Sequence, residues 1–337
     1  MGKKTLRFEN APVIFSSASV VGKKEKEGPL SDYFDMHDPS DKFGLKTFEQ
    51  AESEMQRTAL NLALSKAKAR PEDIEAVFAG DLMNQCTGSS YGLASFGIPY
   101  FGLYGACSTA AEGLMLSAMT VDRGVFLTAA AVSSSHNSSA ERQFRFPLEY
   151  GSQRPPTAQW TATAAAAFLI GRKEDGRKGC AAITEALPGR IVDKGITDAN
   201  NMGAAMAPAA ADTLLRYFID EGHLPSDFDL IVTGDLGHEG HSICKELLSS
   251  EGLELGDIFS DCGIMLYDAK KQDTHSGGSG CGCSASVTAG YIMKGFADGK
   301  FKNVLLIGTG ALMSPSSVQQ GLSIAGIGHL VHLTSVS

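Results

Sequence analysis

One cysteine occupies a position where chain geometry can activate a thiol. Cys107 lies in the run YGACST (residues 104–109), between an apolar segment and a segment rich in Ala, Leu and Met. A turn from a strand into a helix presents its side chains to ligands, and a helix N-terminus lowers the pKa of a thiol. We therefore interpret Cys107 as a candidate nucleophile or ligand contact; the alternative is a small buried core residue.

A long polar loop, residues 133–160, carries the next candidates. His136 follows an apolar segment and is a candidate base or ligand contact. Arg142, Arg145 and Arg154 alternate with aromatic residues in the same loop. Guanidinium groups bind carboxylates in a bidentate manner, and aromatic rings offer faces for stacking. The alternative for each arginine is a solvent-facing side chain in a loop packed by its aromatics.

Two further motifs invite a metal or redox interpretation. Asp235, His238 and His241 lie in GDLGHEGH (residues 234–241), but the HExxH arrangement and a third ligand cluster are missing. The CGC run at 281–283 is shorter than the usual CxxC motif. Nucleotide-binding glycine loops are also lacking. The sequence therefore predicts neither a metal nor a cofactor.

An internal repeat indicates how these residues are brought together. Residues 71–82 read PEDIEAVFAGDL and residues 225–236 read PSDFDLIVTGDL, with five of twelve positions identical. This spacing favours a duplicated domain, with halves at 1–175 and 176–337, over a solenoid of short repeats. The seam between two such halves is a natural place for a pocket.

The hydrophobic pattern predicts an α/β fold in which apolar strands alternate with helices. Buried strands are typically continuous apolar runs when helices cover both faces of a sheet. We expect strands at 11–21, 74–79, 98–104, 125–132, 161–170, 230–233 and 304–308, and helices at 48–69, 108–122, 205–221, 241–251 and 286–299.

Composition limits the classes of function. The 337 residues are 43% hydrophobic and 20% charged, with a net charge of -9, which argues against nucleic acid as a partner. The odd count of seven cysteines and the lack of a signal-like segment favour a reduced, intracellular protein. No apolar run reaches the length of about 18 residues that a transmembrane helix needs.

At these motifs the chain resembles the thiolase superfamily, which includes the ketoacyl synthases. The resemblance implies two duplicated α/β halves in a five-layered α-β-α-β-α arrangement, with Cys107 at the position of the nucleophile. It also implies a histidine in the segment GGSGCGCSASVTAG (residues 277–290), where this chain has Ser284. A second family histidine falls near Asp235. Without these partners a condensing reaction loses its base and its oxyanion donors, unless His136, His238 or His275 replaces them.

A closer resemblance, to the stage V sporulation protein AD family, covers nearly the whole chain. Its most specific segments are AGDLMNQ, GLYGACSTAAEG, TGDLGHEG and the long loop. The resemblance implies a non-catalytic protein that binds dipicolinic acid, or its calcium chelate, and takes part in its uptake into the developing spore. It also implies partnership with the SpoVA membrane proteins and a peripheral place at the spore inner membrane. The thiolase resemblance implies a homodimer, because proteins of that fold usually pair. The ligand-contacting residues that we expect are Cys107, His136, Arg142, Asp235, His275 and Ser284.

Two alternatives stay open at this point. The first is an active acyltransferase or condensing enzyme of the ketoacyl synthase type, which would use Cys107 covalently. The second is a scaffold that holds membrane partners together, with a vestigial cleft.

Overall fold

The computed structural model describes residues 4–144 and 153–336. Two sets of strands follow the same plan. In the first, the order is β5-β4-β6-β8-β2, and in the second it is β11-β10-β13-β14-β9. The strands of the first set are β2 (Val13–Val21), β4 (Ala76–Gly80), β5 (Tyr100–Leu103), β6 (Ala129–Ser135) and β8 (Ala164–Gly171). Those of the second are β9 (Ala181–Leu187), β10 (Leu230–Thr233), β11 (Phe259–Asp261), β13 (Asn303–Leu312) and β14 (Ala325–Ser335).

The two sets also agree in strand direction. The pairs β4–β5 and β4–β6 are parallel, as are β10–β11 and β10–β13, whereas β6–β8 and β13–β14 are antiparallel. The strands β2 and β9 pair with each other, so the two sets form one continuous sheet. Short strands complete it: β1 (Leu6–Arg7) pairs with β9, β3 (Met36–His37) pairs with β2, and β7 (Trp160–Thr161) pairs separately with β12 (Gly278–Ser279).

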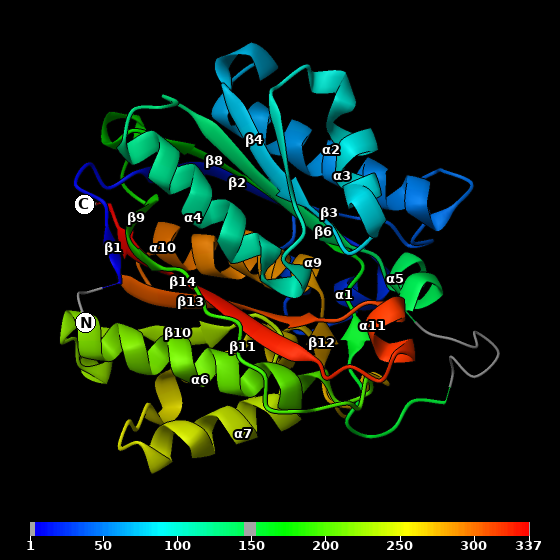
Figure 1. Ribbon diagram of the computed structural model, residues 1–337. Helices are drawn as coiled ribbons and strands as arrows, with labels where there is room; N and C mark the ends of the chain where they lie inside the picture. The colour runs from blue at the N-terminus through cyan, green and yellow to red at the C-terminus, as the bar shows by residue number, and fades with distance from the viewer. Residues whose placement is uncertain (1–3, 145–152, 337) are drawn as a thin grey trace.

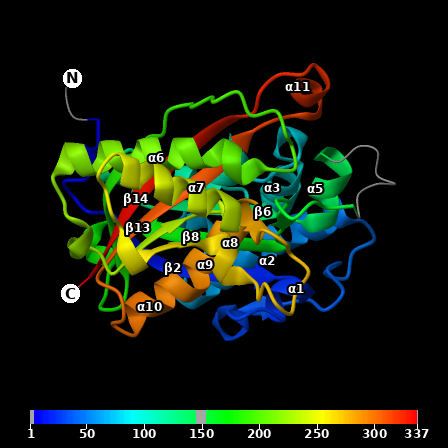
Figure 2. The same cartoon turned by 90° about the horizontal axis from the view of Figure 1, so that it is seen from below.

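Helices form three layers around the two sets of strands (Figure 1). One outer layer contains α2 (Phe48–Ala67) and α3 (Thr87–Leu93), and the other contains α6 (Met202–Glu221) and α7 (Gly237–Ser250). Between the two sets lie α4 (Thr109–Asp122), α9 (Cys281–Val287) and α10 (Met293–Ala297), and Figure 2 shows the second outer layer from below. The remaining helices are α1 (Lys23–Lys26), α5 (Asn137–Phe144), α8 (Cys262–Leu266) and α11 (Pro315–Gln319). This is the five-layered α/β fold expected from the sequence.

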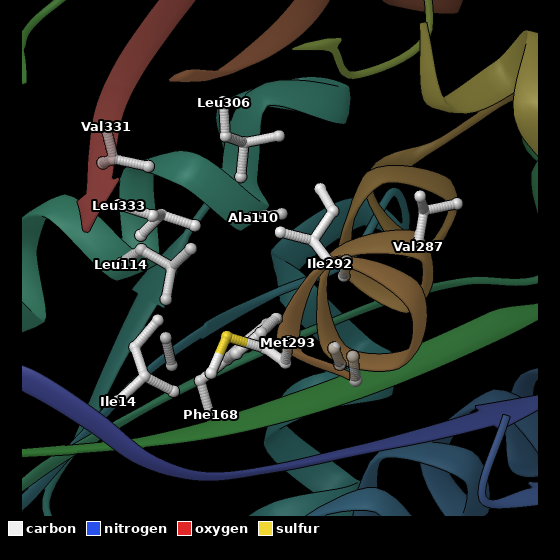
Figure 3. Packing of buried hydrophobic residues seen from close by; sticks show 14 of the residues in the cluster. Ile14, Ala110, Leu114, Phe168, Val287, Ile292, Met293, Leu306, Val331 and Leu333 are labelled. Atoms are coloured by element: carbon white, nitrogen blue, oxygen red, sulfur yellow. The ribbon is translucent and has the colours of Figure 1, made fainter. Parts of the chain in front are cut away.

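The central core explains why α4 and α9 are largely apolar. Leu114 of α4 and Ile292, which follows α9, are fully buried, and they pack with Phe168 of β8 and Leu306 of β13 (Figure 3). A helix covered on all sides is apolar all round, which is why the 108–122 segment carries so many small and aliphatic residues. All seven cysteines are free and buried.

Several elements differ from the expectation. The strand expected at 125–132 is β6, Ala129–Ser135, and the helix expected at 241–251 begins at Gly237. The helix expected at 286–299 begins earlier, at Cys281, and is interrupted by a π-helical turn at Thr288–Ile292 before α10. The long strand β14 was missed because its Gly and His residues interrupt the apolar run. Among the described residues, no helix is both long enough and apolar enough to cross a membrane.

Candidate functional site

A cavity of about 380 Å³ opens between the two halves of the sheet, at the starts of the central helices. Cys107 precedes α4 and Ser279 precedes α9, and both side chains line it. The wall is mostly apolar, with hydroxyl and amide groups among the carbon atoms. The described lining residues are Leu82, Tyr104, Ala106, Cys107, Ala140, Glu141, Phe144, Gln159, Thr161, Ala199, Asn200, Met202, Ser279, Ala311, Leu312, Met313, Ser314 and Ser317.

A sharp turn places Cys107 at the inner end of this cavity. The chain leaves β5, passes Gly105, and adopts a left-handed backbone at Ala106 with φ of 50°. A non-glycine residue rarely adopts this conformation, and such strain is found most often at functional positions. A single 3₁₀ turn at Ala106–Ser108 then leads into α4. The Cys107 side chain is therefore aimed into the cavity while only 7% of the residue is exposed.

Behind the thiol lies a hydrogen-bonded carboxylate instead of a histidine. The Cys107 Sγ is 3.8 Å from Ser279 Oγ, and Ser279 Oγ donates to Asp235 Oδ2 at 3.1 Å. The same oxygen accepts from the Gly280 backbone N–H at 2.9 Å, and Thr309 Oγ1 donates to Asp235 Oδ1 at 2.7 Å. Asp235 is fully buried, and burial raises its pKa to about 6 despite these donors.

This environment keeps the thiol protonated. Burial, followed by the charge of Asp235 and the neighbouring Cys281, raises the pKa of Cys107 well above its ordinary value. The sequence-based expectation that the helix N-terminus lowers this pKa is therefore wrong. Burial disfavours the ionised form of the sulfur because water is excluded, and the carboxylate on the far side of Ser279 repels the resulting charge. This environment disfavours the thiolate, the form in which a cysteine is nucleophilic.

His136 lies apart from the cavity lining and has a structural role. Its residue is 1% exposed, its Nε2 contacts the Asp41 carbonyl at 2.8 Å, and its Nδ1 accepts from the Ser138 backbone N–H at 3.1 Å. These contacts assign the ring proton to Nε2, and burial lowers the His136 pKa. A neutral ring with both nitrogens engaged holds the start of α5 rather than a ligand.

The predicted arginines are already paired. Arg142 forms an ion pair with Glu49 at 3.1 Å on the surface. Arg154 donates to the Asp273 carboxylate at 2.6 Å and packs over Trp160, with 5.0 Å to the ring centroid. Arg145 lies outside the described residues. No arginine, lysine or histidine is present among the described residues that line the cavity.

His275 and Ser284, the remaining candidates, also lie outside the cavity lining. His275 is exposed, contacts the Pro155 carbonyl at 2.7 Å and pairs with Asp273 at 3.0 Å. Ser284 is buried one turn inside α9, where it donates to the Cys281 carbonyl at 3.4 Å. Of the six residues expected at the site, the structure brings together Cys107 and Asp235. The side chain that faces the thiol from the second half is Ser279, five residues before the position obtained by length matching.

Sequence reasoning missed two groups of residues. The first comprises Gln159 and Thr161, which line the cavity from the end of the long loop and from β7. The second comprises Glu185, His223 and His332, which lie close together in the second half. Their positions are dispersed along the chain, so no local motif marks them. The pairing of β9 with β14 brings Glu185 and His332 together, and the end of α6 adds His223.

Comparisons with known proteins place this geometry in a family. A family model described as Stage V sporulation protein AD matches residues 2–334. The Stage V sporulation protein AD of Bacillus subtilis (strain 168) is 42% identical over 328 residues, which cover 97% of this chain and 96% of that protein.

Solved structures support the fold. Two crystal structures of cerulenin-bound OleA from Xanthomonas campestris are each 15% identical to the chain. The co-crystal superimposes with a TM-score of 0.61 and covers 98% of both chains. The soaked crystal gives a TM-score of 0.62 and covers 98% of this chain and all of the other. At this identity the likeness concerns the thiolase-like fold alone. The match to the family model and to the Bacillus subtilis protein shows more, namely that the chain belongs to the stage V sporulation protein AD family.

Proposed function

We propose that this protein binds dipicolinic acid without chemical conversion and takes part in its uptake into the developing spore. The observation that carries the proposal is the Cys107 cavity, which keeps the position of a catalytic thiol but has no histidine among the described residues of its lining. Asp235 lies behind Ser279 where a histidine would be needed. A protein of the sporulation family with such a cavity is better suited to holding a small molecule than to acyl transfer.

The character of the lining favours a particular form of the ligand. Dipicolinate is a flat dianion, whereas the described residues of the lining include no cationic side chain. Chelation of Ca²⁺ neutralises the dianion, so the chelate suits this lining better than the free dianion does. Hydroxyl groups of Thr161, Ser279 and Ser314 provide the oxygen contacts that such a chelate prefers, and Tyr104 offers an aromatic face. We therefore assign the calcium chelate, rather than free dipicolinate, as the preferred ligand.

Titration calorimetry with three ligands tests this assignment. The purified protein is titrated with dipicolinate, with CaCl₂, and with an equimolar mixture of the two. We expect binding of the mixture to be tighter than binding of either component. The absence of heat with every ligand at millimolar concentration would contradict the proposed function. Tighter binding of free dipicolinate than of the chelate would contradict the assigned form only.

A pair of tryptophan variants locates the binding. Ala199 lies half-buried on the cavity wall, so Ala199→Trp places an indole in the space that the ligand would need. Ile219 is 80% exposed on α6, so Ile219→Trp adds the same group away from the cavity. We expect affinity to fall by roughly tenfold or more in the first variant, a loss of about 1.4 kcal/mol, and to be unchanged in the second. Equal affinities would place the ligand elsewhere.

An active acyltransferase is the second candidate, because the Cys107 thiol does face a cavity. Incubation with an acyl-CoA, followed by intact-mass measurement, separates the two functions. The raised pKa of the thiol leads us to expect no adduct at neutral pH. A stable acyl group on Cys107, absent from Cys107→Ala, would favour the enzyme.

We also propose that the chain works as a homodimer associated with the SpoVA membrane proteins. Strand β5 is the outer strand of its set, and it carries the exposed aromatic residues Tyr100 and Phe101. An uncovered apolar edge strand is a ready site for pairing with a second copy. Association with the spore inner membrane would then run through the partner proteins.

A further inference from the structure

Three metal-binding side chains meet in the second half of the molecule, away from the Cys107 cavity. Glu185 on β9 lies directly opposite His332 on β14, and the register of the two strands shifts immediately after His332. Bulges of this kind re-aim side chains and are common beside functional sites. His223 follows α6, whose end at Gly222 has a φ of 71° that turns the chain back toward the strands. Figure 1 shows α6 packed on this part of the sheet.

The donor atoms have the separations that a metal ion requires. His223 Nε2 is 3.2 Å from Glu185 Oε2, and His332 Nδ1 is 3.4 Å from the same oxygen. All three donor atoms lie within 4.8 Å of one another. Tetrahedral Zn²⁺ with bonds of about 2.0–2.1 Å holds its ligand atoms about 3.3 Å apart. The two distances from Glu185 Oε2 to the histidine nitrogens therefore already match this value. A small rotation of one imidazole brings the two nitrogens to the same distance from each other.

The surrounding groups orient these donors. His223 Nδ1 lies 3.7 Å from the Asp227 carboxylate, which is longer than a hydrogen bond but places a negative charge beside the ring. The His332 ring is 7% exposed, and its Nε2 has no hydrogen-bond partner among the described residues. Burying an unpaired polar nitrogen is unfavourable, so the stabilising interaction of this ring must be made through Nδ1. A bond from Nδ1 to a metal ion is such an interaction.

Two further side chains define the limits of the site. Tyr217 Oη donates to Glu185 Oε2 at 2.6 Å and lies 3.2 Å from His332 Nδ1, so it holds the carboxylate in place from outside the triangle of donor atoms. Arg7 Nε is 3.6 Å from the other carboxylate oxygen, Oε1, and forms an ion pair with Glu221 as well. Arg7 therefore contacts Oε1, whereas Oε2 is the oxygen that faces the two histidines. The His223 side chain is 29% exposed and gives the ion access from solvent.

We propose that Glu185, His223 and His332 bind one Zn²⁺ ion, with water as the fourth ligand. Two nitrogens and a carboxylate form a donor set typical of zinc sites in proteins. The ion joins β9, β14 and the end of α6, and its role is to fix the outer helix layer to the sheet. This proposal does not depend on dipicolinate binding, because none of these residues lines the Cys107 cavity.

Zinc binding to the full chain tests the proposal. The protein is stripped with a chelator, transferred to chelator-free buffer, and titrated with ZnCl₂ by calorimetry; metal content after gel filtration gives the stoichiometry. Co²⁺ is used in parallel, because its visible absorption distinguishes tetrahedral coordination. We expect one tightly bound ion per chain, a tetrahedral Co²⁺ spectrum, and a higher melting temperature with Zn²⁺.

Three variants identify the ligands. His223→Ala removes a half-exposed ligand, Glu185→Gln removes the charge with little change in volume, and His275→Ala removes an exposed histidine far from the cluster. Melting curves without metal establish that each variant folds. We expect affinity for Zn²⁺ to fall by roughly 100-fold or more in the first two variants, and to be unchanged in the third. Failure of the wild-type chain to retain zinc, or wild-type affinity in His223→Ala, would overturn the proposal.

Discussion

The charge of Asp235 adds to the effect of burial in suppressing the reactivity of Cys107, and its share can be measured by alkylation. The two distances through Ser279 place the Asp235 carboxylate no more than about 7 Å from the thiol sulfur. At an effective dielectric constant of about 20, a unit charge at about 7 Å opposes ionisation of the thiol by about 2 kcal/mol. Removing that charge with Asp235→Asn lowers the thiol pKa and increases the thiolate fraction about 30-fold.

The measurement is the rate at which iodoacetamide modifies the Cys107 peptide, followed by mass spectrometry at pH 8. Since burial raises the Asp235 pKa only to about 6, the carboxylate is ionised at this pH. Asparagine can still accept from the Gly280 N–H, so the fold should survive. Glu141→Gln is the control, because it removes a carboxylate from the cavity wall without touching this network. An unchanged or slower rate in a folded Asp235→Asn variant would refute this electrostatic account.

Three further outcomes follow from particular contacts. Glu25 is buried, and burial raises its pKa from 4.5 to about 7. As the pH rises from 4.5 to about 7, the carboxyl group therefore loses its proton in the unfolded chain before it does so in the folded one. The free energy of unfolding falls by about 3 kcal/mol over this pH range. Urea denaturation should show a weaker pH dependence for Glu25→Gln, and equal slopes would disprove the burial argument. Phe101→Asp should convert a dimer to a monomer in light scattering while Ile219→Asp does not; a dimeric Phe101→Asp would exclude the β5 edge. Gly282→Ala would force a Cβ against a β8 carbonyl and should lower the free energy of unfolding by about 1–3 kcal/mol. The control is Gly113→Ala in α4, whose added Cβ meets only ordinary contacts. Equal melting temperatures of the two variants would count against this packing.

Much of the fold was predictable because the pattern of apolar residues is strong where helices cover both sides of a strand. The strand at 230–233 was predicted with its observed ends, and the helix at 48–69 was predicted to within two residues. Strand β14 escaped prediction because Gly326, Gly328 and His329 interrupt its apolar character. Its long antiparallel pairing with β13 compensates for that weak local signal.

The candidate site was predictable only where it is local in sequence. The turn at Cys107 was recognisable, because a strand, a small-residue turn and a helix follow one another. The pKa of the thiol was not, because it depends first on the burial of Cys107 in the folded chain and then on the charge of Asp235 from the other half. His136 and Arg142 looked available in the sequence, but their partners, Asp41 and Glu49, come from distant segments.

The central claim is that the Cys107 cavity holds an intact ligand. A crystal structure of the protein grown with dipicolinate and Ca²⁺ tests it most directly. We expect electron density for the planar chelate inside the cavity, beside Cys107 and Ser279, with no bond to the sulfur. Density for a covalent adduct on Cys107, or for dipicolinate bound only at another place on the molecule, would contradict the claim.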